Sequence, residues 1–262
     1  MSKNKISVRE DGHVLMIGLN RPEKYNAFDL EMYRDLGIAL GELHNNSNLR
    51  CGVLFAEGDN FTAGLELNEW APFFSKGRFP DLPENAVDPL GLDENNRLRK
   101  PLVMAVQGIC FTIGMELLLA TDIRVAANNT RLAQIEVKRG IYPVGGATVR
   151  LMQEIGWSNA MRYLLTGDEI NAKDALHMGL VQEVTEPGKQ TKRAIEIAGR
   201  IARQAPLGVM ASLKSSRLAR AHGDNSAIAR LLPDLIPIMK TEDFQEGIQS
   251  FLERRNARFK GC

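Results

Sequence analysis

The sequence has few of the residues that crosslink a chain or ligate metals. It contains three cysteines and four histidines in 262 residues. Cys51, Cys110 and Cys262 are widely spaced and form no CxxC pair, so they indicate neither a disulfide framework nor a metal site, and they fit a reducing compartment. Cys110 is expected to be a small core residue. The histidines accompany no nucleophile motif such as GxSxG, which disfavours a Ser–His hydrolase.

Long apolar runs and an excess of one charge are also missing. No segment approaches the ~20 apolar residues that span a bilayer, and the opening MSKNKISVRE has no apolar core of a signal peptide. Lys and Arg number 33 against 32 Asp and Glu, a net charge of +1. We therefore expect a cytoplasmic protein with no membrane or nucleic-acid partner, in which any anion site is local.

The N-terminal part alternates strand and helix signals. Residues 5–10 and 14–19 predict two strands around an Asp-Gly turn. Asp29 is a capping residue for a helix that runs to about Asn45, with apolar residues at helical spacing. The run CGVLFA from Cys51 is typical of a strand covered on both faces. The length allows one large domain, or one domain with an appendage.

Residues 67–100 are less regular. Trp70, Phe73 and Phe74 precede a stretch rich in Pro, Gly, Asp and Asn, GRFPDLPENAVDPLGLDENN. Segments of this kind are commonly functional lids. The alternative is that the three aromatic residues anchor a surface loop on the core.

The part after Gly146 is mostly helical. Pro233 and Pro237 are expected to interrupt the penultimate helix of the chain. The predicted elements are helices at 146–155, 159–166 capped by Ser158 and 172–178 capped by Asn171, a strand VQEV, and helices at 189–204, 206–222, 225–239 and 243–257.

Two carboxylates stand out in the stretch from Pro101 to Gly146. An apolar strand at 102–106 leads through a Gly108 turn into a short helix that carries Glu116, and a later segment ends in Glu136. Both glutamates lie among apolar residues, which disfavours the ionised form and raises the pKa toward the range of general acid–base catalysis. Each alone is as readily explained as a buried structural carboxylate.

The start of that short helix suits an oxyanion. Gly108 and Gly114 allow tight turns and a close approach to a ligand. A helix that begins near Thr112 or Ile113 leaves its first N–H groups without partners, and such groups stabilise negative charge on oxygen.

Four motifs, in order along the chain, carry a family resemblance. NRPEKYNAFD, GDNFTAGLEL, GICFTIGMELLLATDIRVA and LAQIEVKRGIYPVGGATVRL together resemble the crotonase superfamily, most closely its enoyl-CoA hydratases. The resemblance implies an α/β fold, a crotonase-type spiral of repeated ββα units over residues 1–195 with a CoA-thioester site. It also implies a helical C-terminal trimerisation region at 196–262, and hence a homotrimer or homohexamer.

The same resemblance implies roles for particular residues. The backbone N–H groups of Leu65 and Ile113 would form the oxyanion hole. Glu116 would activate the water and Glu136 would protonate the α-carbon. The acyl-CoA substrate would contact Lys24 and Ala27 near its nucleotide, and further residues along the pantetheine and thioester: Ala63, Gly64, Glu66, Leu67, Asn68 and Gly114. Lys24 is equally well explained as a solvated loop charge. No metal and no separate cofactor is expected.

The resemblance favours hydration of a trans-2-enoyl-CoA to a 3-hydroxyacyl-CoA, because both glutamates are present. An isomerase, a thioesterase and a non-catalytic CoA- or RNA-binding scaffold remain alternatives. The sequence departs from the family pattern at Thr112-Ile113-Gly114, where three glycines are usual, and at Glu66, where Asp is usual. The loop after Pro143 is one residue short. We expect the Ile113 side chain to narrow or shift the pocket.

Overall fold

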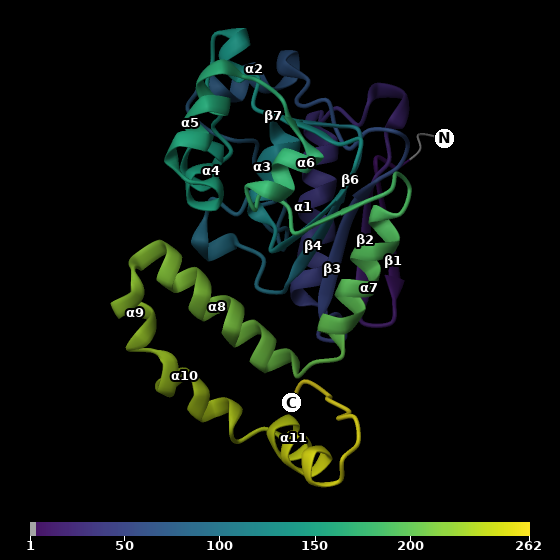
Figure 1. Cartoon of the computed structure of the whole chain (residues 1–262), viewed down its shortest axis with the longest axis vertical. Helices are drawn as coiled ribbons and strands as arrows, with labels where there is room; N and C mark the ends of the chain where they lie inside the picture. The colour runs from purple at the N-terminus through teal and green to yellow at the C-terminus, as the bar shows by residue number, and fades with distance from the viewer. Residues whose placement is uncertain (1–3) are drawn as a thin grey trace.

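Six strands form the main sheet of this computed structural model, which describes residues 4–262 (Figure 1). The first two strands are antiparallel and all later neighbours are parallel. In their order across the sheet, the strands are β1 (Ile6–Asp11), β2 (Val14–Leu19), β3 (Cys51–Ala56), β4 (Leu102–Val106), β6 (Ile123–Ala127) and β9 (Glu183–Thr185). The predicted hairpin and the predicted strand at CGVLFA are confirmed.

The main sheet is covered on both faces. Leu15 and Ile17 of β2 point into the larger core cluster, which includes α1 (Leu30–Asn45), whereas Val14 and Met16 pack with α7 (Gln190–Ala202) on the other face. Side chains alternate between the faces of a strand, so a strand covered twice needs apolar residues at every position. This explains the unbroken apolar runs of β2 and β3.

A second, three-stranded sheet lies beside the stretch that carries the two glutamates. Its strands, in order, are β5 (Ile109–Phe111), β7 (Arg131–Ala133) and β8 (Ile170–Asn171). The turn at Gly108 is confirmed, with a left-handed φ of +54°. It leads first into β5, which the sequence did not indicate, and only then into α3 (Ile113–Ala120).

The predicted helices between Gly146 and Gly179 are present with small shifts, whereas the helix at 67–74 and three short 3₁₀ helices were not predicted. Asp29 and Asn171 cap their helices as predicted, since each side chain accepts a backbone N–H, from Met32 at 2.9 Å and from Asp174 at 2.8 Å. Ser158 is not a cap, because α5 begins at Trp157, directly after Gly156, and Ser158 therefore lies inside the helix. These helices are α2 (Leu67–Phe74), α4 (Ala147–Ile155), α5 (Trp157–Thr166) and α6 (Ala172–His177), with 3₁₀ helices η1 (Pro22–Lys24), η2 (Glu94–Asn96) and η3 (Glu136–Arg139).

The aromatic residues of the segment after β3 fix it to the core. Trp70 of α2 is fully buried, and its indole N–H donates to the carbonyl of Phe28 at 2.9 Å. Its ring packs edge-on against Tyr33, with centroids 5.0 Å apart, and against Phe74 at 5.6 Å. The anchoring role that the sequence left open is therefore confirmed for Trp70, and residues 67–74 are a regular helix.

The last four helices form an arm that extends away from the sheet (Figure 1). Pro233 and Pro237 do not interrupt a helix as predicted, because the break already lies at 229–230. Pro233 then falls in the first turn of α10, where no helical partner for an N–H exists. The helices are α8 (Pro206–His222), α9 (Asp224–Ile228), α10 (Leu231–Ile238) and α11 (Glu242–Leu252).

The arm returns to the body near its own start. The guanidinium of Arg50, just before β3, donates to the carbonyls of Ala202 at 3.0 Å and Phe259 at 2.7 Å. The Asp243 carboxylate accepts the N–H of Gly261 at 2.8 Å, which ties the chain end to α11.

Over residues 4–262, none of the helices combines the length and hydrophobicity required to cross a membrane.

Candidate active site

A cavity of about 700 Å³ brings the two predicted catalytic glutamates together. Most of its wall is apolar, as is usual for a site that takes an organic ligand. The residues that line it are Ala63, Leu65, Leu67, Phe74, Gly77, Arg78, Phe79, Thr112, Glu116, Ile135, Glu136, Arg139, Gly140, Ile141, Tyr142 and Val144. The wall therefore combines α2, the start of α3 and the η3 segment, which lie far apart in the sequence.

Glu116 lies in the first turn of α3 and is 5 % exposed. Burial raises the pKa of its carboxyl to about 8, and the nearby negative charge of Glu136 acts in the same direction. The N–H of Ala147, at the start of α4, donates to Glu116 Oε1 at 3.3 Å. Gly145 makes room for this carboxylate, because a Cβ there would lie 2.3 Å from Oε2. The position of Glu116 thus depends on the Gly145-Gly146 loop.

Glu136 begins η3 and does not lie in a strand. It is 8 % exposed, and burial raises the pKa of its carboxyl to about 7. The side-chain amide of Gln134, in the orientation that satisfies both of its polar atoms, donates to the two carboxylate oxygens at 2.8 and 2.9 Å. Two buried carboxyls with pKa values near neutrality therefore share one cavity, as the sequence predicted.

Two backbone N–H groups, one of a cavity-lining residue and one of the residue that follows the cavity-lining Thr112, make no backbone hydrogen bond within residues 4–262. They belong to Leu65, which follows the left-handed Gly64, and to Ile113, the first residue of α3. The Gly64 carbonyl accepts from Phe28 at 2.8 Å, which fixes the turn that presents Leu65. These are the donors that the resemblance implied for an oxyanion hole, and both remain free for a ligand.

The Ile113 side chain does not narrow the pocket, so that prediction is wrong. It is 1 % exposed, packs in the larger core cluster and is not part of the cavity wall. Thr112 lines the cavity instead. Its backbone has φ 49° and ψ −114°, a rare conformation for a β-branched residue. Its hydroxyl oxygen is buried without a partner and lies 2.4 Å from where a Cβ on Gly64 would be.

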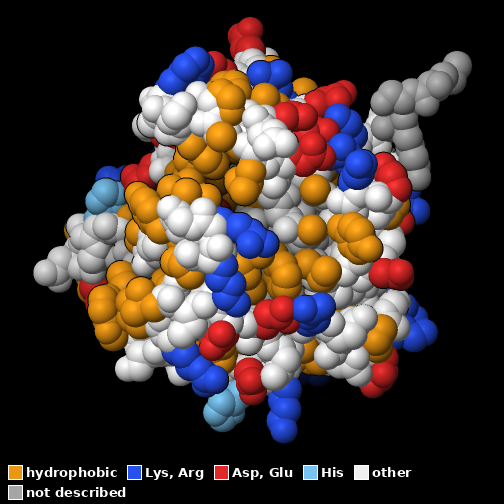
Figure 2. Space-filling model, turned by 90° about the horizontal axis from the view of Figure 1, so that it is seen from above, with side chains coloured by type: hydrophobic (Ala, Val, Ile, Leu, Met, Phe, Trp, Pro, Cys, Tyr) orange, Lys and Arg blue, Asp and Glu red, His pale blue; other side chains and the backbone are white. Residues whose placement is uncertain are grey.

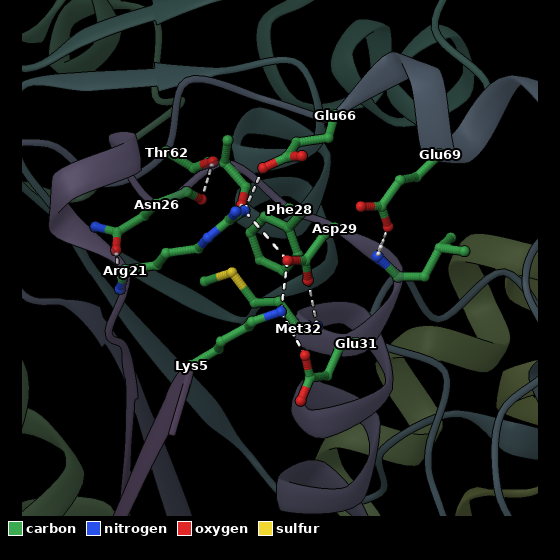
Figure 3. Close-up of polar contacts among 12 residues, drawn as sticks. Lys5, Arg21, Asn26, Phe28, Asp29, Glu31, Met32, Thr62, Glu66 and Glu69 are labelled. Carbon is green, nitrogen blue, oxygen red and sulfur yellow. Dashed lines mark hydrogen bonds and ion pairs between the residues drawn. The ribbon is translucent and has the colours of Figure 1, made fainter. Parts of the chain in front are cut away.

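Glu66 makes an ion pair instead of lining the cavity. Figure 3 shows its carboxylate meeting the Arg21 guanidinium, which also lies 3.3 Å from Asp29 and donates to the Ala27 carbonyl at 3.0 Å. Lys5 approaches Asp29 at 2.6 Å from the other side. The structure thus uses the carboxylate at position 66 to hold the loop of Ala27 against the turn that presents Leu65.

Asn26 supports the same loop from within. Its backbone is left-handed, with φ 52°, and its fully buried amide donates to the carbonyls of Glu57 at 3.0 Å and Asn60 at 2.9 Å. The Asn26 carbonyl accepts the Thr62 hydroxyl at 2.7 Å (Figure 3), and that hydroxyl oxygen in turn accepts the N–H of Gly64 at 3.1 Å. A chain of hydrogen bonds therefore connects this loop to the oxyanion segment.

Only some of the predicted substrate contacts line the cavity. Those outside the cavity wall are Lys24, Ala27, Gly64, Glu66, Asn68 and Gly114. Lys24 is an exposed residue at the end of η1, and Asn68 is exposed on α2. Gly114 is buried beneath the start of α3, where a Cβ would meet Thr62 at 2.5 Å. Ala63, Leu65 and Leu67 do line the cavity.

Several residues at the cavity were not predicted as site residues. Phe74, Phe79 and Tyr142 supply aromatic surface, and Arg78 and Arg139 supply positive charge. Arg78 pairs with Asp81 at 2.7 Å, whereas no acidic side chain pairs with Arg139 in the described chain. Phe74 was noted in the sequence only as one of three neighbouring aromatic residues. Arg78, Phe79 and Tyr142 lie outside helices and strands, so no periodic pattern marks them.

The outer surface agrees with the balanced charge of the sequence. On the side drawn in Figure 2, viewed from above relative to Figure 1, apolar side chains form patches with Lys, Arg, Asp and Glu between them, and that side carries no continuous basic area. No group of three or more His, Cys, Asp or Glu side chains in residues 4–262 could hold a metal ion.

Comparisons with known proteins point to one family. The sequence matches the family model described as enoyl-CoA hydratase/isomerase over residues 9–262. It is 34 % identical to the enoyl-CoA hydratase EchA19 of Mycobacterium tuberculosis over 97 % of this chain and 95 % of that protein. It is 28 % identical to a mitochondrial Delta(3,5)-Delta(2,4)-dienoyl-CoA isomerase of Dictyostelium discoideum, over 98 % of this chain and 90 % of that one.

Solved structures agree. A crystal structure described as a probable enoyl-CoA hydratase/isomerase from Mycobacterium abscessus superposes with a TM-score of 0.95 at 46 % identity, covering 98 % of this chain and 99 % of that one. An enoyl-CoA hydratase from Mycobacterium tuberculosis superposes with a TM-score of 0.88 at 32 % identity, covering 99 % and 100 %. The predicted fold class, an α/β spiral of ββα units followed by helices, is confirmed. The chain belongs to the enoyl-CoA hydratase/isomerase family of the crotonase superfamily.

Proposed function

We propose that this protein is an enoyl-CoA hydratase, which adds water reversibly to a trans-2-enoyl-CoA to give a 3-hydroxyacyl-CoA. The observation that carries the proposal is the shared cavity of Glu116 and Glu136, both buried with raised pKa values, beside the free N–H groups of Leu65 and Ile113. Relatives described as hydratases support it, among them a short-chain-enoyl-CoA hydratase of Clostridium acetobutylicum at 31 % identity.

The reaction assigns a task to each group. The thioester oxygen would accept the N–H groups of Leu65 and Ile113, which stabilise the enolate-like charge that develops there. Glu116 would take a proton from a water molecule as its oxygen bonds to the β-carbon, and Glu136 would give a proton to the α-carbon. Dehydration is the reverse. Neither direction needs a redox cofactor, and coenzyme A enters as part of the substrate.

The two carboxyls need different protonation states for these tasks. With pKa values of about 8 for Glu116 and about 7 for Glu136, the pair holds one proton near pH 7.5. The higher pKa of Glu116 favours that carboxyl as the carrier, so the proposed roles require the proton to pass to Glu136 before water adds. One acid and one base are then present together, the condition for concerted proton transfer. At lower pH both are protonated and no base remains, while at higher pH both are ionised and no acid remains.

The test is turnover of short, medium and branched enoyl-CoA thioesters, followed at the loss of the conjugated double bond. Glu116→Gln and Glu136→Gln should each lower kcat by roughly 10²–10⁴-fold and leave thioester binding nearly unchanged, because acid–base groups act mainly in the transition state. Absence of hydration on every thioester by the wild-type protein would refute the proposal.

Isomerisation is the second candidate, favoured by the dienoyl-CoA isomerase among the relatives. Moving a double bond needs one proton shuttle beside the oxyanion hole. Retained activity in Glu116→Gln, with a double-bond shift that is lost in Glu136→Gln, would identify an isomerase. A thioesterase would instead release free CoA, and a scaffold that only binds CoA or RNA would show no turnover.

We also propose that the chain consists of a core, residues 1–195, and an oligomerisation region, residues 196–262. This region would assemble the protein into a homotrimer or homohexamer. Neither α8 nor α10 has a buried residue within residues 4–262. Large apolar side chains of the arm are exposed, namely Ile228, Leu231, Leu232, Leu235, Ile236, Met239, Ile248, Phe251 and Leu252. Burial against other copies would remove this surface from water. A monomer in sedimentation at micromolar concentration would contradict the proposal.

A cytoplasmic location accords with the bacterial relatives.

A further inference from the structure

A second cavity, of about 230 Å³, lies at the opposite end of α3 from the glutamates. It shares no residue with the catalytic cavity, since Thr112 and Glu116 line one while Leu119 and Thr121 line the other. Its remaining wall residues are Arg97, Asp122, Arg124, Glu154, Gln182, Leu213, Ser216, Arg217 and Arg220. We call this cavity the arginine pocket.

The arginine pocket carries an excess of positive charge. Its four guanidinium groups, from Arg97, Arg124, Arg217 and Arg220, face only two carboxylates, so two positive charges remain uncompensated. The balanced composition of the whole chain makes such a local excess unusual, and a partly enclosed cavity strengthens its field.

Both carboxylates are already engaged. Glu154 pairs with Arg124 at 2.9 Å and with Arg220 at 2.8 Å. Asp122 pairs with Arg217 at 2.8 Å, and its other oxygen accepts the N–H of Leu102 at 3.0 Å. These contacts connect the starts of β4 and β6 to α4 and α8. They engage both carboxylates with three of the arginines, so the fourth, Arg97, has no carboxylate partner in the pocket.

Arg97 has no hydrogen-bond acceptor and no ion-pair partner in the described chain, residues 4–262. Burial, together with the positive charges of Arg217 and Arg150, lowers the pKa of its guanidinium to about 10. A guanidinium has five N–H donors, and a half-buried one is expected to find acceptors. Asp122 acts on Arg97 in the opposite direction, but its carboxylate is already paired with Arg217, so a counter-charge from outside the chain would be favourable here.

Two further donors in the same wall are orphaned. Among residues 4–262, the Nε groups of Arg124 and Arg217 are buried without an acceptor. Arg124 is 3 % exposed, so bulk water does not replace the missing partner. These unpaired donors leave the positive charge of both guanidinium groups incompletely satisfied by the protein, which favours an anion beside them.

We propose that the arginine pocket is a binding site for a compact oxyanion, a phosphate group or a carboxylate, with Arg97 as its main ligand. Forked guanidinium groups match the oxygen spacing of both anions. Arg97 comes from the loop before β4 and Arg217 and Arg220 come from α8, so the anion bridges the body and the arm. It would therefore stabilise the docking of α8.

The experiment compares the wild-type protein with Arg97→Gln and with Arg99→Gln, an exposed arginine two residues along the chain as a matched control. Thermal unfolding is followed in inorganic phosphate and in sodium chloride of equal ionic strength. We expect a saturable rise in Tm with phosphate for the wild type and Arg99→Gln, and binding at least about tenfold weaker in Arg97→Gln. Without phosphate, Arg97→Gln should be no less stable than the wild type at low protein concentration.

Sedimentation of the same proteins separates the two sources of the anion. If a carboxylate of a second copy occupies the pocket, phosphate gives no rise in Tm, and Arg97→Gln sediments as a smaller species than Arg99→Gln. A phosphate effect that is equal in all three proteins overturns the proposal. So does the absence of both a phosphate effect and a change in assembly.

Discussion

The raised pKa of Glu116 predicts how the stability of the protein depends on pH. The carboxyl is 5 % exposed, packed inside a helix of apolar residues and close to a second carboxyl. Ionising it inside the folded protein is therefore unfavourable, whereas in the unfolded chain it ionises at the ordinary value of 4.5. Glu116→Gln removes this difference while keeping an oxygen that can accept the N–H of Ala147.

The magnitude follows from the interval between the two pKa values. Below about pH 4.5 both states bind the proton and the residue contributes nothing to the pH dependence. Between 4.5 and about 8 the folded state keeps the proton that the unfolded state has released, so the free energy of unfolding falls as pH rises. At about 1.4 kcal/mol per pH unit, the full loss by pH 9 is roughly 5 kcal/mol.

The assay is urea denaturation at pH 5, 7 and 9. At pH 5, Glu116→Gln should unfold at nearly the same urea concentration as the wild type. At pH 9, the variant should be more stable by ~2–5 kcal/mol, the lower figure allowing for relaxation around the ionised carboxyl. Glu84→Gln, at an exposed position, is the matched control and should follow the wild type throughout.

Parallel stability curves for Glu116→Gln and the wild type would refute the reasoning, because they would mean that Glu116 titrates normally in the folded protein. Adding Glu136→Gln to make a double variant measures the repulsion between the carboxyls. If that repulsion contributes to the raised pKa, the gain from Glu116→Gln at pH 9 should be smaller when Glu136 is already neutral.

Three other substitutions test the local geometry. Gly145→Ala, at a glycine without left-handed φ, should displace the Glu116 carboxylate and lower kcat by about 10²-fold with Tm little changed, and wild-type kcat would contradict this. Thr112→Gly should raise the free energy of unfolding by ~1–2 kcal/mol, since it removes a strained φ and an orphaned hydroxyl; a loss of stability in urea would show that neither is costly. Ile113→Gly should cost about 3 kcal/mol or more and leave acyl preference unchanged, because the side chain belongs to the core; a broader acyl range would place it at the cavity.

Much of the fold could be predicted because its signals are local. The Asp-Gly turn, the Asp29 cap and the continuous apolar run from Cys51 each depend on a few neighbouring residues, and all three are confirmed. The strand β5 was missed because its three residues form a sheet only with β7 and β8, which follow later in the chain. The 3₁₀ turn that begins at Glu136 was not predicted, since it has no distinctive pattern.

The same difference between local signals and contacts between distant parts of the chain applies to the site residues. The two glutamates were predictable because a charge in an apolar run is visible in the sequence. The direction of the Ile113 side chain was not, because the backbone of Thr112 turns it into the core. The arginine pocket left no trace in the sequence, since Arg97 and Arg217 meet only through the docking of α8 on the body.

The return of the arm to its own starting point has a consequence for the integrity of the molecule. Arg50 bonds to Ala202 before the arm and to Phe259 after it, so the arm is a loop closed at its neck and not a free tail. A protease that cuts once between α9 and α10 would therefore leave both fragments attached to the body, the distal one through the bond of Arg50 to Phe259 and the ion pair of Asp234 with Lys214 of α8. Such a nicked protein would run as two bands in a denaturing gel and as one particle in solution, and its arm could exchange amide hydrogens without opening the sheet.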